Sequence, residues 1–340
     1  MNTKSIDILN VGLILLSLFL AVQIPFSLFV FAYALLGPLH YFTEINWLSS
    51  KQYFVKDTWW VGLVIGLCVL LVIPKFFAEP NFSSLYGIQS LQPLLNFLLY
   101  WSNAIIFLLL AIALILISTQ KTSFRVVFIG LAFVAAYFFH TAPLYATIIG
   151  LLVPTLIHVY LFTLLFMIFG AMRSRSRWGY VAVGLVIMVP FVIGSSYINP
   201  QAYLFPDYVK QTMIENSFYK VNIMFGEFLG LTDQTNYEFE AFFMDPMIVK
   251  IQVFIAFSYI YHYLNWFSKT TVIGWHRNLT TKRTLLIFGS WLALAGIFLW
   301  DYKIGFYAVL FFSFLHVFLE FPLNWISIKG IVGKLVPAKL

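Results

Sequence analysis

Apolar residues fill long runs along most of the chain, and short polar segments separate these runs. A helix needs about 20 mostly apolar residues to cross the hydrocarbon core of a bilayer. Nine runs approach or exceed this length, and the first has room for a second boundary at Pro25, so eight to ten spans stay open. The pattern therefore predicts an all-α fold, a polytopic transmembrane helix bundle. The predicted spans are residues 8–36, 59–77, 94–118, 125–142, 144–171, 180–197, 247–267, 285–300 and 306–325.

The segment 198–246 is the one long connection between predicted spans. Its stretch DYVKQTMIENSFYKVNIMFGEFLG mixes apolar and polar residues at helical spacing, which is typical of a helix lying in the membrane interface. We expect an extracytoplasmic interfacial loop that packs on the bundle as a cap. No repeat or linker divides the sequence, so residues 1–340 are expected to form a single integral membrane domain.

Composition narrows the class of protein further. Hydrophobic residues make up 61% of the chain and charged residues only 10%, with a mean hydropathy of +0.91. Soluble domains are about 45–50% apolar and about 25% charged, so the balance excludes a soluble enzyme, a disordered protein and a nucleic-acid binder. The only cysteine, Cys68, lies inside an apolar run, which excludes a disulfide framework and a cysteine-ligated metal centre.

Basic residues concentrate on one side of the predicted bundle. Alternating loops divide the lysines and arginines 14 to 6, which predicts nine spans with the N-terminus outside and the C-terminus in the cytoplasm, in a bacterial inner membrane. The basic side holds Lys51, Lys56, Lys121, Arg125, Arg173, Arg175, Arg177, Lys269, Arg277, Lys282, Arg283, Lys329, Lys334 and Lys339. The other side holds Lys4, Lys75, Lys210, Lys220, Lys250 and Lys303.

Five of the six histidines lie in or at the end of an apolar run. Ionisable side chains are costly in hydrocarbon, so residues of this kind are the first candidates for a function. Four of them fall between the predicted bilayer midplane and the cytoplasmic face, on four different spans: His40, His158, His262 and His316. His140 is displaced toward the opposite face, and His276 belongs to a basic loop.

Two carboxylates accompany these histidines. Glu44 follows His40 by four residues, and Glu320 follows His316 by four, so each pair shares one face of a helix. Prolines lie close to His40, His158 and Glu320, where they free backbone carbonyls and can widen a space between helices. For Glu44 a simple interfacial charge is the structural alternative.

Neutral imidazole is a good ligand for iron, copper or zinc, and nearby carboxylates can ligate or orient a ligand. An iron ion held by histidines alone keeps positions open for dioxygen, and aromatic surroundings suit an apolar substrate that arrives from the bilayer. A histidine that only hydrogen-bonds a neighbouring helix is the structural alternative for each residue taken singly.

Four short patches resemble motifs of a known family. GPLHYFTE is similar to GLPHGxxD with Glu44 in place of the aspartate, and TLIHVYLF to IHFxxxD without its acidic residue. FSYIYHYLNWF matches a histidine after an aromatic run, and FLHVFLEF resembles PHxxxxD. In these patches the chain resembles the bacterial membrane-bound β-carotene 15,15′-dioxygenases of the bacteriorhodopsin-related-protein family. The resemblance implies a non-haem Fe(II) site with His40, His158, His262 and His316 as ligands.

The leading hypothesis is a membrane-embedded, iron-dependent oxygenase that cleaves or oxidises a carotenoid or another apolar isoprenoid with dioxygen. Glu320 and Glu44 are its candidate catalytic residues, orienting a ligand or relaying a proton. Its expected partners are a lipid-soluble substrate and membrane lipids, with no nucleic acid. A haem b-binding electron-transfer protein, a transporter or lipid-handling protein, and a subunit of a larger complex stay open as alternatives.

Overall fold

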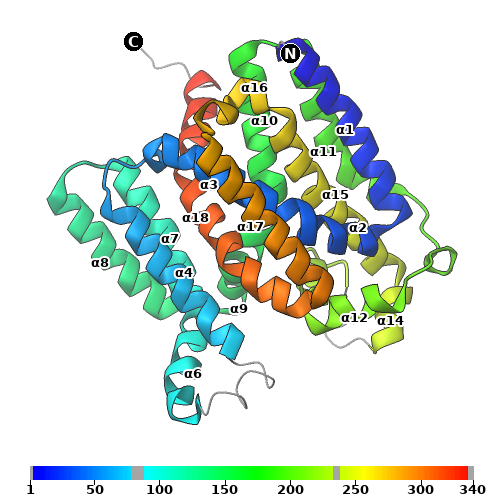
Figure 1. Ribbon diagram of the computed structural model, residues 1–340, viewed down its shortest axis with the longest axis horizontal. Helices are drawn as coiled ribbons and strands as arrows, with labels where there is room; N and C mark the ends of the chain where they lie inside the picture. Colours follow the sequence, from blue (N-terminus) through cyan, green and yellow to red (C-terminus); the bar gives the residue numbers. More distant parts are fainter. Residues whose placement is uncertain (1–2, 78–87, 233–237, 336–340) are drawn as a thin grey trace. The chain divides into compact units, whose positions relative to one another are not determined.

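The computed structural model describes residues 3–77, 88–232 and 238–335, which fold into helices joined by turns (Figure 1). Lys339 and residues 233–237 of the predicted loop lie outside the described residues. Nine helical segments of the described chain are long and apolar enough to cross a membrane, which confirms the predicted all-α polytopic fold of an integral membrane protein. These segments are Thr3–Gln23, Pro25–Ser50, Trp59–Phe77, Thr122–Phe139, Pro143–Ser174, Arg177–Ser195, Pro246–Ser268, Thr281–Trp300 and Tyr302–Gly333.

The first apolar run is broken in two at Pro25, as the sequence left open. Helix α1 (Thr3–Gln23) ends before Ile24, whose φ of −140° and ψ of 57° are not helical. The chain then continues through α2 (Pro25–Phe31), five wide π-helical residues η1 (Ala32–Leu36) and α3 (Gly37–Ser50). His40 therefore lies in a second membrane segment, and not at the end of the first segment, as predicted from the sequence.

Buried amides hold this break. The Gln252 side chain donates from Nε2 to the Pro25 carbonyl oxygen over 3.2 Å, and its Oε1 accepts from Asn222 Nδ2 over 2.9 Å. Pro25 is the first residue of α2, so this bond ties α15 to the helix that follows the break, in an interior where no water competes for the amide. Gln252 and Asn222 thus stabilise the bend that starts the second segment.

The predicted span 94–118 is a bent pair of helices. Helix α6 (Gln92–Tyr100) and helix α7 (Ser102–Ser118) meet at Trp101 with an angle of 53°. Counted as one span, the pair raises the number of crossings in the described chain to ten.

The described chain divides into two compact units, whose boundaries fall inside α3, the helix η4 (Ala146–Phe162) and α18 (Tyr302–Leu335). The first comprises residues 1–43, 155–306 and 327–340, and the second comprises residues 44–154 and 307–326. The expectation of a single domain stays a prediction.

Helix α15 (Pro246–Ser268) is the centre of the first unit. Of the residues in its apolar, membrane-spanning stretch, 83% are buried inside the protein. Helices α1 and α11 (Arg177–Ser195) pack against α15 and against each other. Between α11 and α15 the segment 198–246 forms α12 (Asp207–Glu215), α13 (Tyr219–Phe228) and α14 (Phe239–Met244). These short helices pack on α2 and α15, and Phe242 and Phe243 of α14 are fully buried. The segment therefore caps this unit.

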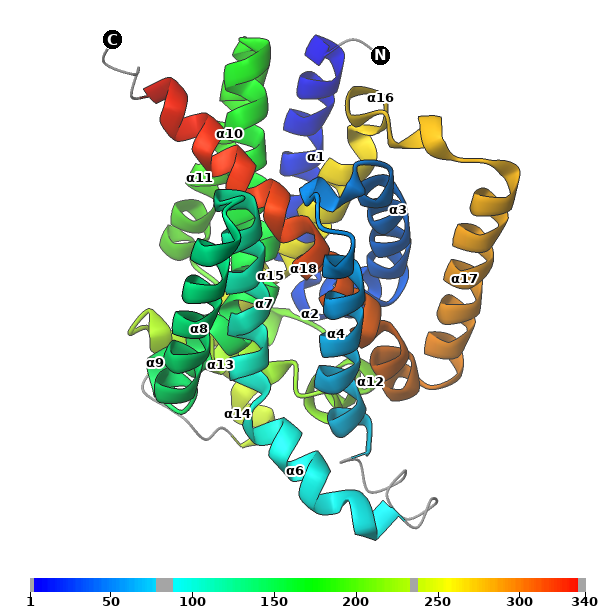
Figure 2. The same cartoon turned by 90° about the vertical axis from the view of Figure 1, so that its left-hand side faces the viewer.

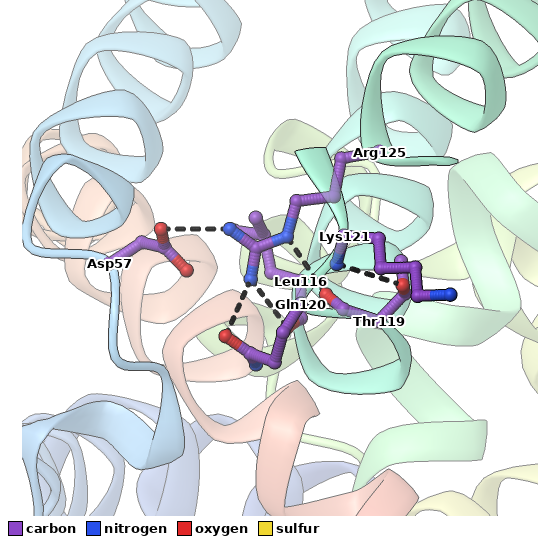
Figure 3. Close-up of polar contacts among 6 residues, drawn as sticks. All are labelled: Asp57, Leu116, Thr119, Gln120, Lys121 and Arg125. Carbon is purple, nitrogen blue, oxygen red and sulfur yellow. Dashed lines mark hydrogen bonds and ion pairs between the residues drawn. The ribbon is translucent and has the colours of Figure 1, made fainter. Parts of the chain in front are cut away.

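The second unit is built on α4 (Trp59–Phe77), α7 and α8 (Thr122–Phe139). Arg125 of α8 joins all three, as Figure 3 shows. Its guanidinium pairs with Asp57 Oδ1 before α4 at 3.0 Å and donates to the Leu116 and Thr119 carbonyls at the end of α7. A basic side chain that covers the last carbonyls of a helix stabilises that end. The remaining α-helices of the described residues are α9 (Pro143–Tyr145), α10 (Thr163–Ser174), α16 (Thr270–Ile273) and α17 (Thr281–Trp300).

Candidate metal centre

Three of the predicted histidines meet inside the first unit. His40 comes from α3, His158 from η4 and His262 from α15, and all three are buried. The Nε2 atoms of His40 and His262 are 3.0 Å apart, and the ring centroids of His158 and His262 are 4.9 Å apart. His40 and His262, 222 positions apart in the chain, thus bring their imidazoles within hydrogen-bond distance.

His316 of α18 completes the group. Each of His40, His158, His262 and His316 offers one ring nitrogen, and these four atoms all lie within 4.8 Å of one another. The four histidines predicted from the sequence are therefore brought together, as a buried group that can hold a metal ion.

The helices that carry two of these histidines contain wide π-helical turns. Five such residues end just before α3, and His158 lies within η4, which is π-helical throughout and contains Pro154. A π turn adds a residue per turn and rotates the following side chains relative to an α-helix, and such turns are frequent at functional sites. Pro154 has no backbone N–H, so one backbone hydrogen bond is missing from η4.

Two histidines have an oxygen partner at Nδ1: the Phe312 carbonyl can only accept from His316, and the Thr163 hydroxyl can accept from or donate to His262. Thr163 Oγ1 lies 2.7 Å from Nδ1 of His262, and the Phe312 carbonyl oxygen lies 3.2 Å from Nδ1 of His316. When Nδ1–H donates to these oxygens, Nε2 is left as a lone-pair donor, which is the usual arrangement of histidine ligands. Thr163 was not predictable as part of the site, because a threonine 99 residues from His262 gives no local sequence signal.

Aromatic side chains surround His40. Tyr263 and Trp266 lie at ring-centroid distances of 5.3 and 5.6 Å from His40. The hydroxyls of Tyr41 and Tyr263 are hydrogen-bonded at 3.1 Å above Gly37, where a Cβ atom would come within 3.1 and 3.2 Å of the two hydroxyl oxygens. A side chain at position 37 would push these hydroxyls by a few tenths of an ångström, so Gly37 favours this close approach, and the packed rings form an apolar wall beside His40.

The two candidate carboxylates are deeply buried within the second unit. Glu44 is 1% exposed and Glu320 is 4% exposed, and their carboxyl groups are close enough to interact electrostatically. A water-exposed interfacial charge, the alternative considered for Glu44, does not describe a side chain that is buried inside the protein. Their catalytic roles stay predictions.

The remaining histidines have structural surroundings. His140 ends α8, where its ring stacks on Trp101 with centroids 4.0 Å apart and its Nδ1 lies 2.7 Å from the Tyr137 carbonyl oxygen. His276 is exposed, with Nδ1 at 3.2 Å from the Thr270 carbonyl oxygen. Neither belongs to the four-histidine group, in agreement with the choice made from depth along the spans.

The spacing of the four nitrogens fits ligands of one metal ion. Nitrogens bound at about 2.1 Å are about 3.0 Å apart at right angles, about 3.4 Å apart at a tetrahedral angle and about 4.2 Å apart when opposite. The Nε2 atoms of His40 and His262 are 3.0 Å apart, and no two of the four nitrogens are more than 4.8 Å apart. The expected separations fall within this range. Neutral imidazole donors of this kind suit iron, copper or zinc.

No protein-family model, curated protein or solved structure matches the chain. The family resemblance therefore rests on the four sequence patches alone.

Proposed function

We propose that the protein is a membrane-embedded non-haem iron oxygenase that cleaves or oxidises a carotenoid or another apolar isoprenoid with dioxygen. The observation that carries the proposal is the set of four buried imidazole nitrogens within 4.8 Å of one another. The sequence resemblance to carotenoid dioxygenases supports the reaction class, and the membrane-spanning helices suit a lipid-soluble substrate.

The close spacing of the nitrogens favours a single ion over haem b. A bis-histidine haem places two imidazoles on opposite faces of a flat macrocycle, with the ring filling the plane between them. Here the Nε2 atoms of His40 and His262 are 3.0 Å apart, which leaves no room for a macrocycle between those two rings. The additional histidines within 4.8 Å would also occupy positions that the macrocycle needs.

Bound ferrous iron would supply the redox chemistry that activates dioxygen, and the side chains of the site would hold the ion and the substrate. His40, His158, His262 and His316 would hold the ion, and Thr163 would keep the His262 ring in the ligating tautomer. Cleavage of a carbon–carbon double bond by dioxygen adds one oxygen atom to each carbon and yields two carbonyl products.

Other residues of the site would bind the substrate and handle protons. The rings of Tyr263 and Trp266 beside His40 would exclude water and contact an apolar polyene. Glu320, with Glu44 near it, would take up or release a proton at a carboxyl oxygen, as proposed from their i+4 spacing to His316 and His40.

The test is turnover by purified protein in nanodiscs, loaded with ferrous iron under anaerobic conditions and then given β-carotene and dioxygen. We expect oxygen uptake and carbonyl products that carry oxygen from labelled dioxygen. His316→Ala should abolish both, whereas His140→Ala, which removes a buried histidine outside the group, should keep them. Iron binding without turnover of any polyene would contradict the proposed oxygenase reaction. A Soret band would support the alternative, a haem b-binding protein.

We also infer that both ends of the chain lie on the cytoplasmic side. At its start α1 meets the end of α15, where Asn10 Nδ2 donates to Ser268 Oγ at 3.0 Å, next to Lys269 of the basic side. In Figures 1 and 2 the start of α1 and the end of α18 lie at the same end of their unit. Ten crossings move Lys4 to the basic side, and the 14 to 6 division of basic residues becomes 15 to 5.

A further inference from the structure

A basic pocket lies in the first unit, away from the histidines. It has a volume of about 760 Å³ and is formed by the start of α1 and the turn from α10 to α11. Figure 2 shows the start of α1 and the end of α10 at the same end of this unit. The lining residues are Thr3, Lys4, Ser174, Ser176, Arg177 and Trp178. Pockets of this size are large enough to take a small ligand or a lipid headgroup.

The walls of the pocket are positively charged. Lys4 and Arg177 line it directly, and Arg173 and Arg175 belong to the same turn. The acidic residue nearest in the chain to Lys4 is Asp7, one turn further along α1, and it interacts electrostatically with Lys269. Burial lowers the pKa of Lys269 to about 8, and the Asp7 carboxylate opposes this fall. The Asp7 carboxylate lies against Gly179 at the start of α11, and four basic residues outnumber it there, so the pocket keeps a net positive charge: Lys4, Arg173, Arg175 and Arg177.

Neutral donors complete the lining. Ser176 Oγ accepts from the backbone nitrogen of Gly179 at 3.2 Å, so its hydroxyl hydrogen remains available to donate. Thr3 adds a second hydroxyl, whereas the Ser174 hydroxyl donates to the Ala171 carbonyl oxygen at 3.4 Å. Trp178, 40% exposed, adds an aromatic ring of the kind enriched at membrane interfaces. Two cations with two hydroxyls around one cavity match the oxygens of a phosphate group.

We propose that this pocket binds the phosphate group of an anionic phospholipid from the cytoplasmic leaflet. The ten-crossing topology proposed above, on which this inference rests, places Lys4 and the turn from α10 to α11 on the cytoplasmic side. Basic pockets between membrane helices on that side are typical sites for anionic lipid headgroups. The site is separate from the metal centre, and lipid bound there ties the start of α1 to the start of α11.

The test compares lipid affinities of delipidated full-length protein in mild detergent, measured by native mass spectrometry. The probes are short-chain phosphatidylglycerol, phosphatidylcholine with the same acyl chains, and inorganic phosphate as a competitor. A basic residue near a lipid surface contributes about 1 kcal/mol, and 1.4 kcal/mol is a tenfold change, so the double variant Lys4→Gln/Arg177→Gln should bind phosphatidylglycerol about 30-fold more weakly.

The matched control is Lys282→Gln/Arg283→Gln at the start of α17, which removes the same charge from exposed residues of the same unit. We expect its affinity to stay within about twofold of the unchanged protein, because only general attraction is reduced. A second variant, Ser174→Phe, fills the pocket without changing charge and should also weaken binding.

Equal affinity of the unchanged protein for the two lipids would overturn the proposal, as would equal losses in the two charge variants. Saturable binding of inorganic phosphate, without any preference for phosphatidylglycerol over phosphatidylcholine, would indicate a site for soluble phosphate. That result would overturn the proposal of a lipid site.

Discussion

Thr163 allows a sharp test of how the site holds a metal. Its Oγ1 lies 2.7 Å from Nδ1 of His262, and both residues are buried, at 3% and 7% exposure. Thr163→Val keeps the shape of the side chain but leaves the Nδ1–H of His262 without its acceptor, which costs about 1–3 kcal/mol. Loss of such an outer hydrogen bond lowers metal affinity by about 10–100-fold.

The assay is an anaerobic competition titration of ferrous iron between the protein and a chromophoric chelator. Thr163→Ser keeps the hydroxyl and should retain most of the affinity. Thr212→Val, in the capping helix α12 and equally buried, is the matched control and should bind iron normally. Equal affinities for Thr163→Val and the unchanged protein would refute the idea that this hydrogen bond orients His262 toward a metal.

Two further predictions concern the fold. Gln252→Leu removes both hydrogen bonds at the break before the second segment, and it should lower the midpoint of thermal unfolding in detergent by several degrees. The control Gln201→Leu, at an exposed position, should leave this midpoint unchanged. The topology can be tested with single-cysteine variants in which Cys68 is replaced by Ala. A membrane-impermeant maleimide should label Ser5→Cys and Thr281→Cys from one side of sealed vesicles and Gln201→Cys from the other side. Labelling of Ser5→Cys from the same side as Gln201→Cys would contradict the ten-crossing topology.

Hydrophobic runs were enough to predict the helices, because a membrane helix needs a long apolar stretch and little else. The break at Pro25 was visible only as an alternative, since proline is tolerated within membrane helices when another group covers the freed carbonyl. Gln252 bonds the start of α2 from a distance of 227 residues, which sequence spacing cannot reveal. This one break changes the expected side of the N-terminus.

The four histidines were predictable for a different reason. Each is an ionisable residue in an apolar run, so each stands out singly, and their common depth suggested a common site. Thr163, Tyr41 and Tyr263 gave no such signal, because hydroxyl and aromatic residues are frequent in membrane helices. The burial of Glu44 was also missed, since its place along the chain suggested the membrane interface.

The most direct test of the metal centre is the metal content and optical spectrum of protein purified in mild detergent and reconstituted with ferrous iron. We predict one iron per chain without a Soret band, and loss of that iron in each of the variants His40→Ala, His158→Ala, His262→Ala and His316→Ala. His140→Ala should retain it. Full iron occupancy in all four variants, or no iron in the reconstituted protein, would contradict the account.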